Sequence, residues 1–156
     1  MWKRQSTALM VAFVLGVTVV VLGADRASGQ ADVHVLMPAA EGRGSIIDVV
    51  GGPGLSIGDG VASRGPLVDT QSREPAGSVY FECTVMRRIG LEEGLWRCSY
   101  LLRLAEGAIV LEGLDPRGMG ASTFAVLGGT KAYRGASGDA VLTDSTEGTD
   151  IVITLI

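Results

Sequence analysis

Short runs of alternating apolar and polar residues, separated by glycine, proline or aspartate, fill most of the chain after residue 58. Alternation with a period of two places successive side chains on opposite faces of a β-strand, and the residues between the runs favour turns. No stretch beyond residue 30 keeps apolar residues at the helical spacing of 3.6 over ten residues. The pattern predicts eight strands, at residues 45–50, 60–69, 78–89, 95–104, 108–114, 122–128, 139–144 and 149–156.

Eight consecutive strands with short connections favour an up-and-down antiparallel sheet. Closing this sheet into a barrel pairs both of its edges, which would otherwise be open to other chains. We expect an all-β protein with a single closed antiparallel eight-stranded β-barrel over residues 58–156. A Gly/Pro-rich segment, residues 30–57, precedes it and carries the first short strand. A sandwich of two sheets is the alternative.

The two central runs allow inner and outer faces to be assigned. In residues 95–104 the apolar side chains fall on even positions, and in residues 78–86 they fall mainly on odd ones, although Tyr80 and Met86 interrupt the second alternation. Because neighbouring positions face opposite sides of a strand, both sets point to the core. The inward side chains are then Val79, Phe81, Cys83, Val85, Trp96, Cys98, Tyr100, Leu102 and Leu104.

Residues 1–29 have the pattern of a secretory signal peptide. Lys3 and Arg4 precede an uncharged apolar run that ends at residue 24, and small residues then fit a cleavage site. The run is short for a membrane span, although a retained anchor is the alternative. We expect a signal-peptide helix that is removed, so that the mature chain begins near Gln30 or Asp32. The protein would then be secreted or extracytoplasmic, with no stable membrane span.

Charge and motif spacing argue against several classes of protein. The formal net charge is −4 and no basic cluster is visible, which does not suggest nucleic-acid binding. Residues 124–139, FAVLGGTKAYRGASGD, lack the P-loop spacing because Thr130 separates Gly129 from Lys131, and no dinucleotide fingerprint occurs. His34, the only histidine, falls in a segment expected to be flexible, and no zinc pattern is present. We expect no metal and no cofactor.

The segment FAVLGGTKAYRGASGDAVL resembles a pattern of the allene oxide cyclase and dirigent protein superfamily of eight-stranded barrels. In that pattern a strand ends in Gly-Gly-Thr-Gly, and an aromatic residue, a charged residue and a small-x-Gly unit lead into the next strand. Upstream, YFECTVMRR looks like the third strand, where plant allene oxide cyclases also carry a cysteine, and LAEGAIVLEG looks like the following strand, turn and strand. The resemblance covers residues 58–156 and implies the barrel fold, a small hydrophobic ligand and a possible homo-oligomer.

The Gly-rich segment is expected to be structural, as the connection between the sixth and seventh of the eight strands. Tyr133 would plug one end of the barrel. Lys131 stands where the superfamily usually has glycine, which leaves open whether the backbone there has a positive φ. The glycines that would form the tight connection are Gly128, Gly129, Gly135 and Gly138.

Plant allene oxide cyclases also carry a glutamate on the first barrel strand, which is thought to stabilise a cationic intermediate. The expected first strand here, SIIDVV, offers only Asp48. Its side chain is shorter and could point to solvent. Asp48 is therefore a weak candidate for a catalytic residue.

Cys83 and Cys98 have three interpretations: a disulfide, two buried thiols, or one pocket thiol as in the plant cyclases. Both side chains face inward, and a four-residue connection at residues 89–92 would place them directly opposite each other. Export to an oxidising compartment favours the bond. We therefore expect a disulfide between Cys83 and Cys98.

Three functions remain, and the barrel interior distinguishes them. A dry apolar cavity fits a secreted barrel that binds or steers a small hydrophobic molecule, as in dirigent proteins. A cavity with a buried charge fits an isomerase or cyclase without metal or nucleotide, as in allene oxide cyclases. A filled interior fits a structural role. We expect the first, with a ligand bound by Phe81, Cys83, Val85, Trp96, Tyr100 and Leu102.

Overall fold

The computed structural model describes residues 31–39, 43–49, 51, 54–88, 94–117 and 120–156. The expected signal helix, residues 1–29, lies outside these described residues. Within them the chain forms nine strands and one short 3-10 helix, η2 (Lys131–Tyr133). The strands are β1 (Ala31–Pro38), β2 (Arg43–Ile47), β3 (Gly60–Asp69), β4 (Pro75–Arg88), β5 (Gly94–Leu104), β6 (Gly107–Arg117), β7 (Ala121–Gly129), β8 (Gly138–Asp144) and β9 (Gly148–Leu155).

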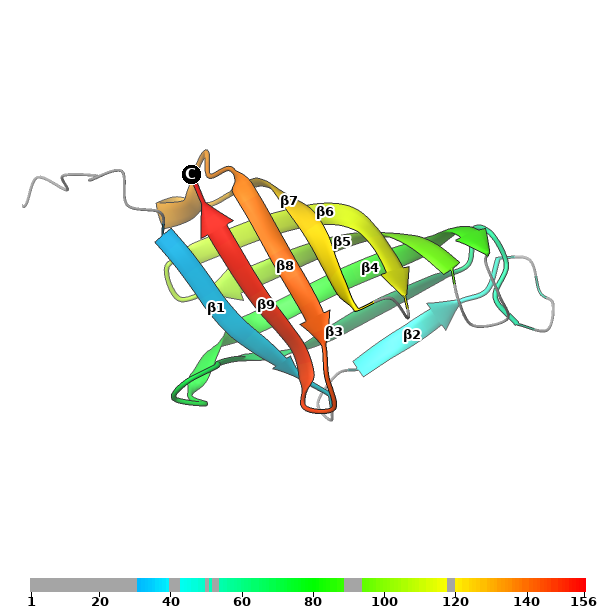
Figure 1. Cartoon of the computed structure of the whole chain (residues 1–156), viewed down its shortest axis with the longest axis horizontal. Helices are drawn as coiled ribbons and strands as arrows, with labels where there is room; N and C mark the ends of the chain where they lie inside the picture. Colours follow the sequence, from blue (N-terminus) through cyan, green and yellow to red (C-terminus); the bar gives the residue numbers. More distant parts are fainter. Residues whose placement is uncertain (1–30, 40–42, 50, 52–53, 89–93, 118–119) are drawn as a thin grey trace, which may run out of the picture.

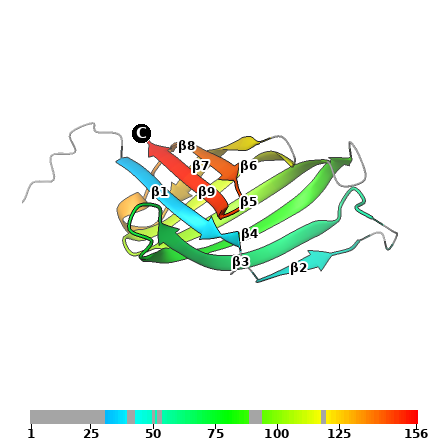
Figure 2. The same ribbon diagram turned by 60° about the horizontal axis from the view of Figure 1, so that its bottom comes forward.

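The strands form one closed antiparallel barrel (Figure 1). Strands β3 to β8 each pair with the next strand along the chain, and β1 pairs with β9 over its whole length. The barrel closes where β1 also meets β3, with Val35 opposite Asp69 and Leu36 opposite Val68. Figure 2 shows β1 lying between β9 and β3. The closed eight-stranded barrel expected from the sequence is confirmed, with β1 and β3 to β9 as its strands.

The first strand of the barrel is not the one expected. We predicted it at residues 45–50, whereas the structure places β1 at Ala31–Pro38, inside the segment expected to lead into the barrel. Strand β1 directs Val33, Val35 and Met37 against the core, while every side chain of β2 is exposed. Because burial of an apolar face stabilises a strand within a barrel, β1 takes the closing position. Strand β2 is left outside, paired with the first half of β3.

His34 was expected in a flexible segment, and this expectation is wrong. It lies on the outer face of β1, with Nε2 2.9 Å from Oδ1 of Asp150 on β9. Both side chains are partly exposed, so the pair contributes little to stability.

The remaining seven expected strands are present. The inner and outer faces assigned to two of them, β4 and β5, are as predicted. Val79 and Val85 on β4 and Trp96 and Leu102 on β5 are buried. The interrupted alternation at Met86 coincides with a register shift between β4 and β5 at this point. Much of the interior is filled by fully buried side chains, which include Leu67, Val79, Leu102, Ile109, Leu111, Ile151 and Ile153.

The two cysteines are joined by a disulfide, as expected. Cys83 on β4 lies directly opposite Cys98 on β5, and their Cα atoms are 4.0 Å apart. Both residues are buried in the core. The connection expected at residues 89–92 falls outside the described residues. A structural disulfide indicates that the protein folds in an oxidising compartment.

The Gly-rich segment joins β7 to β8 through η2, at one end of the barrel. Lys131 has a φ of 53°, so the backbone there has the left-handed conformation that usually favours glycine, although the residue is a lysine. At Gly129 a side chain would collide with the carbonyl oxygen of Ala108. Tyr133 packs against the core here, and burial, with a smaller contribution from Glu106, raises the pKa of its hydroxyl. Gly128, Gly135 and Gly138 all have positive φ.

Candidate functional site

A pocket of about 230 Å³ opens at the end of the barrel opposite η2. It lies where β6 and β8 end and where β7 and β9 begin, so four strand ends surround it. We call it the mouth pocket. Its lining residues are Met37, Phe81, Tyr100, Asp115, Gly120, Ser122, Phe124, Leu142, Asp144 and Thr149.

Three aromatic rings form one wall of the mouth pocket. Phe81 on β4 stacks on Tyr100 of β5, with ring centroids 5.1 Å apart. Tyr100 in turn meets Phe124 of β7 edge to face at 5.2 Å. Such contacts fix the rings relative to one another, so the wall is rigid and mainly apolar.

Two carboxylates border the same pocket. Asp115 at the end of β6 is partly buried, and its Oδ1 accepts a hydrogen bond of 2.7 Å from the hydroxyl of Ser122. Asp144 at the end of β8 is exposed and accepts a hydrogen bond of 2.7 Å from the hydroxyl of Thr149. Each hydroxyl fixes one carboxylate oxygen. The pocket therefore combines an aromatic wall with two oriented negative groups.

The predicted ligand-binding residues divide into two groups. Phe81 and Tyr100 line the mouth pocket. The other four, Cys83, Val85, Trp96 and Leu102, are buried in the core cluster and do not line it. The sequence thus identified correctly which side chains face inward. It did not distinguish the inward side chains that line the pocket from those that are packed in the core.

Asp48, the weak catalytic candidate, lies beyond the end of β2 and is exposed. Its Oδ1 accepts a hydrogen bond of 2.6 Å from the backbone N–H of Gly51, three residues along the chain. It does not line the mouth pocket. This geometry gives Asp48 a role in the local turn.

Sequence reasoning missed the polar residues of the mouth pocket. Asp115 and Ser122 flank one strand connection, and Asp144 and Thr149 flank the next. In the sequence these positions look like ordinary turn residues. The available signal was their place at strand ends on the same side of an up-and-down barrel, since alternate connections share one end.

In the described part of the chain, no group of three or more His, Cys, Asp or Glu side chains could hold a metal ion. Among the same residues, no helix is long and apolar enough to span a membrane.

No family model and no curated protein matches the chain. Solved structures do share its fold. Pyocyanin demethylase superposes with a TM-score of 0.69 at 18% identity, over 81% of this chain and 100% of that one. AbnU, an exo-specific intermolecular Diels-Alderase, has a TM-score of 0.62 at 21% identity, over 81% of this chain and 98% of its own. The pterocarpan synthase dirigent protein GePTS1 has a TM-score of 0.60 at 18% identity, over 82% and 86%.

These likenesses show that the chain has the eight-stranded barrel fold of allene oxide cyclase-like and dirigent proteins. At such identities they show the fold alone, because one fold hosts many chemistries. Any activity must be argued from the residues of the mouth pocket.

Proposed function

We propose that the protein binds a small aromatic molecule in the mouth pocket and holds it in one orientation, as a dirigent-like steering protein would. One observation carries this proposal. Side chains fill much of the barrel, yet at one end a hollow lined by Phe81, Tyr100 and Phe124 is bordered by two carboxylates.

The size of the pocket limits the ligand. A dry apolar cavity of about 150 Å³ accommodates benzene, so about 230 Å³ has room for a molecule of one or two rings. Burying about 200 Å² of apolar surface would contribute about 5 kcal/mol before the losses of association. We therefore expect affinities in the micromolar to millimolar range.

The carboxylates determine which end of the ligand faces outward. Asp115 and Asp144 accept hydrogen bonds and attract positive charge, so they favour a ligand with an amine or hydroxyl group at the mouth. A ligand carboxylate would be repelled. Orientation follows because the ring goes to the aromatic wall while the polar group stays beside Asp115.

Solved proteins with this barrel support a small-molecule function. Their names describe a demethylase, a Diels-Alderase and a dirigent protein. The disulfide in turn supports a secreted or extracytoplasmic location for this chain.

Isothermal titration calorimetry with two ligands of matched shape tests the proposal. We expect 2-naphthylmethylamine to bind at least about tenfold more tightly than 2-naphthoate, because one ligand pairs with the carboxylates and the other is repelled. Asp115→Asn should reduce this preference. Asp139→Asn, which removes an exposed carboxylate elsewhere on β8, should leave it unchanged. If neither compound shows saturable binding, the proposal is refuted.

A cyclase or isomerase function is the second candidate, and Asp115 is the observation that favours it. Ring closure through a cation needs a negative group oriented in advance, and Ser122 holds Asp115 in this way. Stereospecific conversion of an epoxide or polyene, lost in Asp115→Asn but kept in Asp139→Asn, would establish catalysis. If the product is racemic or if no product forms, catalysis is refuted and only the binding function remains.

A further inference from the structure

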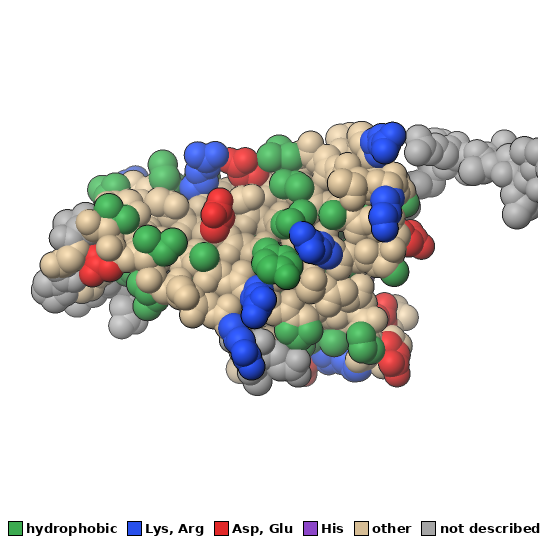
Figure 3. Space-filling model, turned by 180° about the vertical axis from the view of Figure 1, so that it is seen from behind, with side chains coloured by type: hydrophobic (Ala, Val, Ile, Leu, Met, Phe, Trp, Pro, Cys, Tyr) green, Lys and Arg blue, Asp and Glu red, His purple; other side chains and the backbone are tan. Residues whose placement is uncertain are grey.

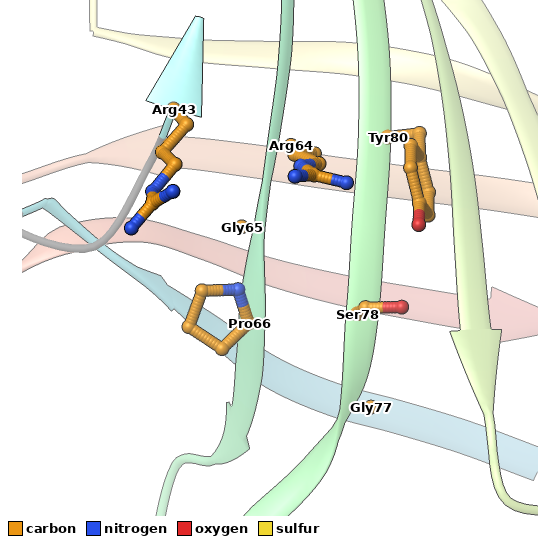
Figure 4. A pocket seen from close by; sticks show the side chains of 7 residues that line it. All are labelled: Arg43, Arg64, Gly65, Pro66, Gly77, Ser78 and Tyr80. Atoms are coloured by element: carbon orange, nitrogen blue, oxygen red, sulfur yellow. The ribbon is translucent and has the colours of Figure 1, made fainter.

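A second hollow, of about 350 Å³, lies on the outer surface of the barrel. It is lined by Arg43 of β2, by Arg64 and Pro66 of β3, and by Ser78 and Tyr80 of β4 (Figure 4). Even-numbered residues of β3 and β4 point away from the core, since Val61, Leu67, Val79 and Cys83 point into it. The outer groove, as we call this hollow, is therefore separate from the mouth pocket.

Positive charge is concentrated along the outer groove. Arg43 lies directly opposite Arg64 in the pairing of β2 with β3, and Arg64 lies directly opposite Tyr80 in the pairing of β3 with β4. The guanidinium carbon of Arg103 lies 5.3 Å from the centre of the Tyr80 ring. Seen from behind, basic side chains form a row across the barrel beside hydrophobic ones (Figure 3).

These three arginines have no carboxylate partner among the described residues. Elsewhere on the surface, Arg73 pairs with Glu147 and Arg97 with Glu112. Glu82, the next outward residue of β4 after Tyr80, lines a different hollow together with Arg97 and Glu112. The groove thus stays positive in a chain whose formal net charge is −4.

Two arginines directly opposite each other in a strand pair repel, which destabilises the pairing. Strand β2 gains little in compensation, because none of its side chains is buried. Its clearest effect is to bring Arg43 beside Arg64 at the groove. An anion held between the two guanidinium groups would turn this repulsion into attraction.

We propose that the outer groove binds a phosphate or sulfate ester, with the anionic group between Arg43 and Arg64 and the organic part against Tyr80. A planar guanidinium offers two parallel N–H donors that match the oxygens of such a group. The Ser78 hydroxyl adds a donor, and Pro66 and the Tyr80 ring provide apolar surface. Arg103 lies over Tyr80 and adds positive charge beside the ring.

Calorimetry at low ionic strength, with phenyl phosphate and inorganic phosphate as probes, tests this site. Phenyl phosphate should bind more tightly than inorganic phosphate because its ring contacts Tyr80. The double variant Arg43→Gln/Arg64→Gln should lose at least about tenfold in affinity for both, since each charged hydrogen bond is worth more than a neutral one. Arg134→Gln, which removes an exposed arginine beside η2, should stay within about twofold.

The change in melting temperature on adding phosphate gives a second readout. Each protein is compared with itself without phosphate, so a difference in stability between wild type and variant does not affect the result. Phosphate should raise the melting temperature of the wild type more than sodium chloride of equal ionic strength, by mass action. It should not do so for the double variant, which without anion should be at least as stable as the wild type because the repulsion is gone. An equal response of both proteins to phosphate, or unchanged phenyl phosphate affinity in the double variant, would overturn the proposal.

Sedimentation with phosphatidylglycerol vesicles then identifies the source of the ester. Vesicle binding that needs Arg43 and Arg64 indicates a lipid phosphate. Binding of phenyl phosphate without vesicle binding indicates a free ester.

Discussion

Removing the Cys83–Cys98 disulfide should lower the stability of the barrel by an amount that the structure allows us to work out. The bond joins residues 15 apart in sequence. For a loop of this length, loop closure removes about 10 cal/mol/K of entropy from the unfolded chain, or about 3 kcal/mol at 25 °C. For a domain of this size, this corresponds to a fall in melting temperature of about 10 °C.

The perturbation must remove the cross-link without changing the packing. Both cysteines are buried, so replacement by alanine would add the cost of a cavity. Reduction keeps both sulfur atoms in the core and creates no cavity, so the loss of stability reports mainly on the bond. Because the sulfurs are inaccessible in the folded barrel, we expect reductant to act only after denaturant has unfolded the chain.

Urea unfolding of the oxidised and the reduced, refolded protein measures the difference, and mass spectrometry verifies the thiol state. The double variant Cys83→Ala/Cys98→Ala should be less stable than the reduced protein by the cavity term alone. A loss below about 1 kcal/mol on reduction would refute the loop-closure reasoning. Free thiols in freshly exported protein would refute the bond itself.

Three further predictions concern the loop, a titration and the N-terminus. Replacing Lys131 by glycine should raise the free energy of unfolding by about 1 kcal/mol, because the left-handed backbone strains a lysine. The adjacent control, Ala132→Gly, should lower the free energy of unfolding. A Lys131→Gly variant that is less stable than the wild type would contradict the reasoning. The folded-state pKa of Tyr133 lies above 10.0, so the stability linked to its neutral phenol is complete below about pH 10 and is lost as the pH rises through that pKa. Urea unfolding above pH 10 should show a steeper loss for the wild type than for Tyr133→Phe, and parallel curves would argue against the shift. N-terminal sequencing of exported protein should begin at Gln30 or Asp32, near the start of β1; recovery of the full-length chain in membranes would exclude this.

The positions of seven barrel strands, the faces of β4 and β5 and the pairing of the two cysteines could be read from the sequence, because each depends on residues close together in the chain. A period of two fixes which side chains share a face, so Trp96, Tyr100 and Leu102 were assigned inward without a structure. The assumption of a four-residue connection placed Cys83 opposite Cys98. The structure has the same cysteine pairing, but it reaches it with Arg88 opposite Gly94 and a register shift between Val85 and Arg87.

The first strand was misplaced because its pairing is not local. Residues 45–50 and 31–38 both have strand-like patterns, and the choice between them depends on β9, more than a hundred residues away. His34 on β1 and Asp150 on β9 are 116 residues apart. Only the closed barrel shows that β1 buries its apolar face and that the apolar side chains of β2 stay exposed.

From the sequence alone came an all-β chain of short strands, its inward face, its disulfide and the superfamily that it resembles. The tertiary structure decided where that face is filled and where it is hollow. Phe81 and Leu102 have the same alternation and both point inward, but Phe81 meets the mouth pocket while Leu102 is packed on all sides. The carboxylates of Asp115 and Asp144 lie at one mouth of the barrel because closure brings the ends of β6 and β8 around the same opening. This position depends on all the strand pairings together, not on any single segment of the chain.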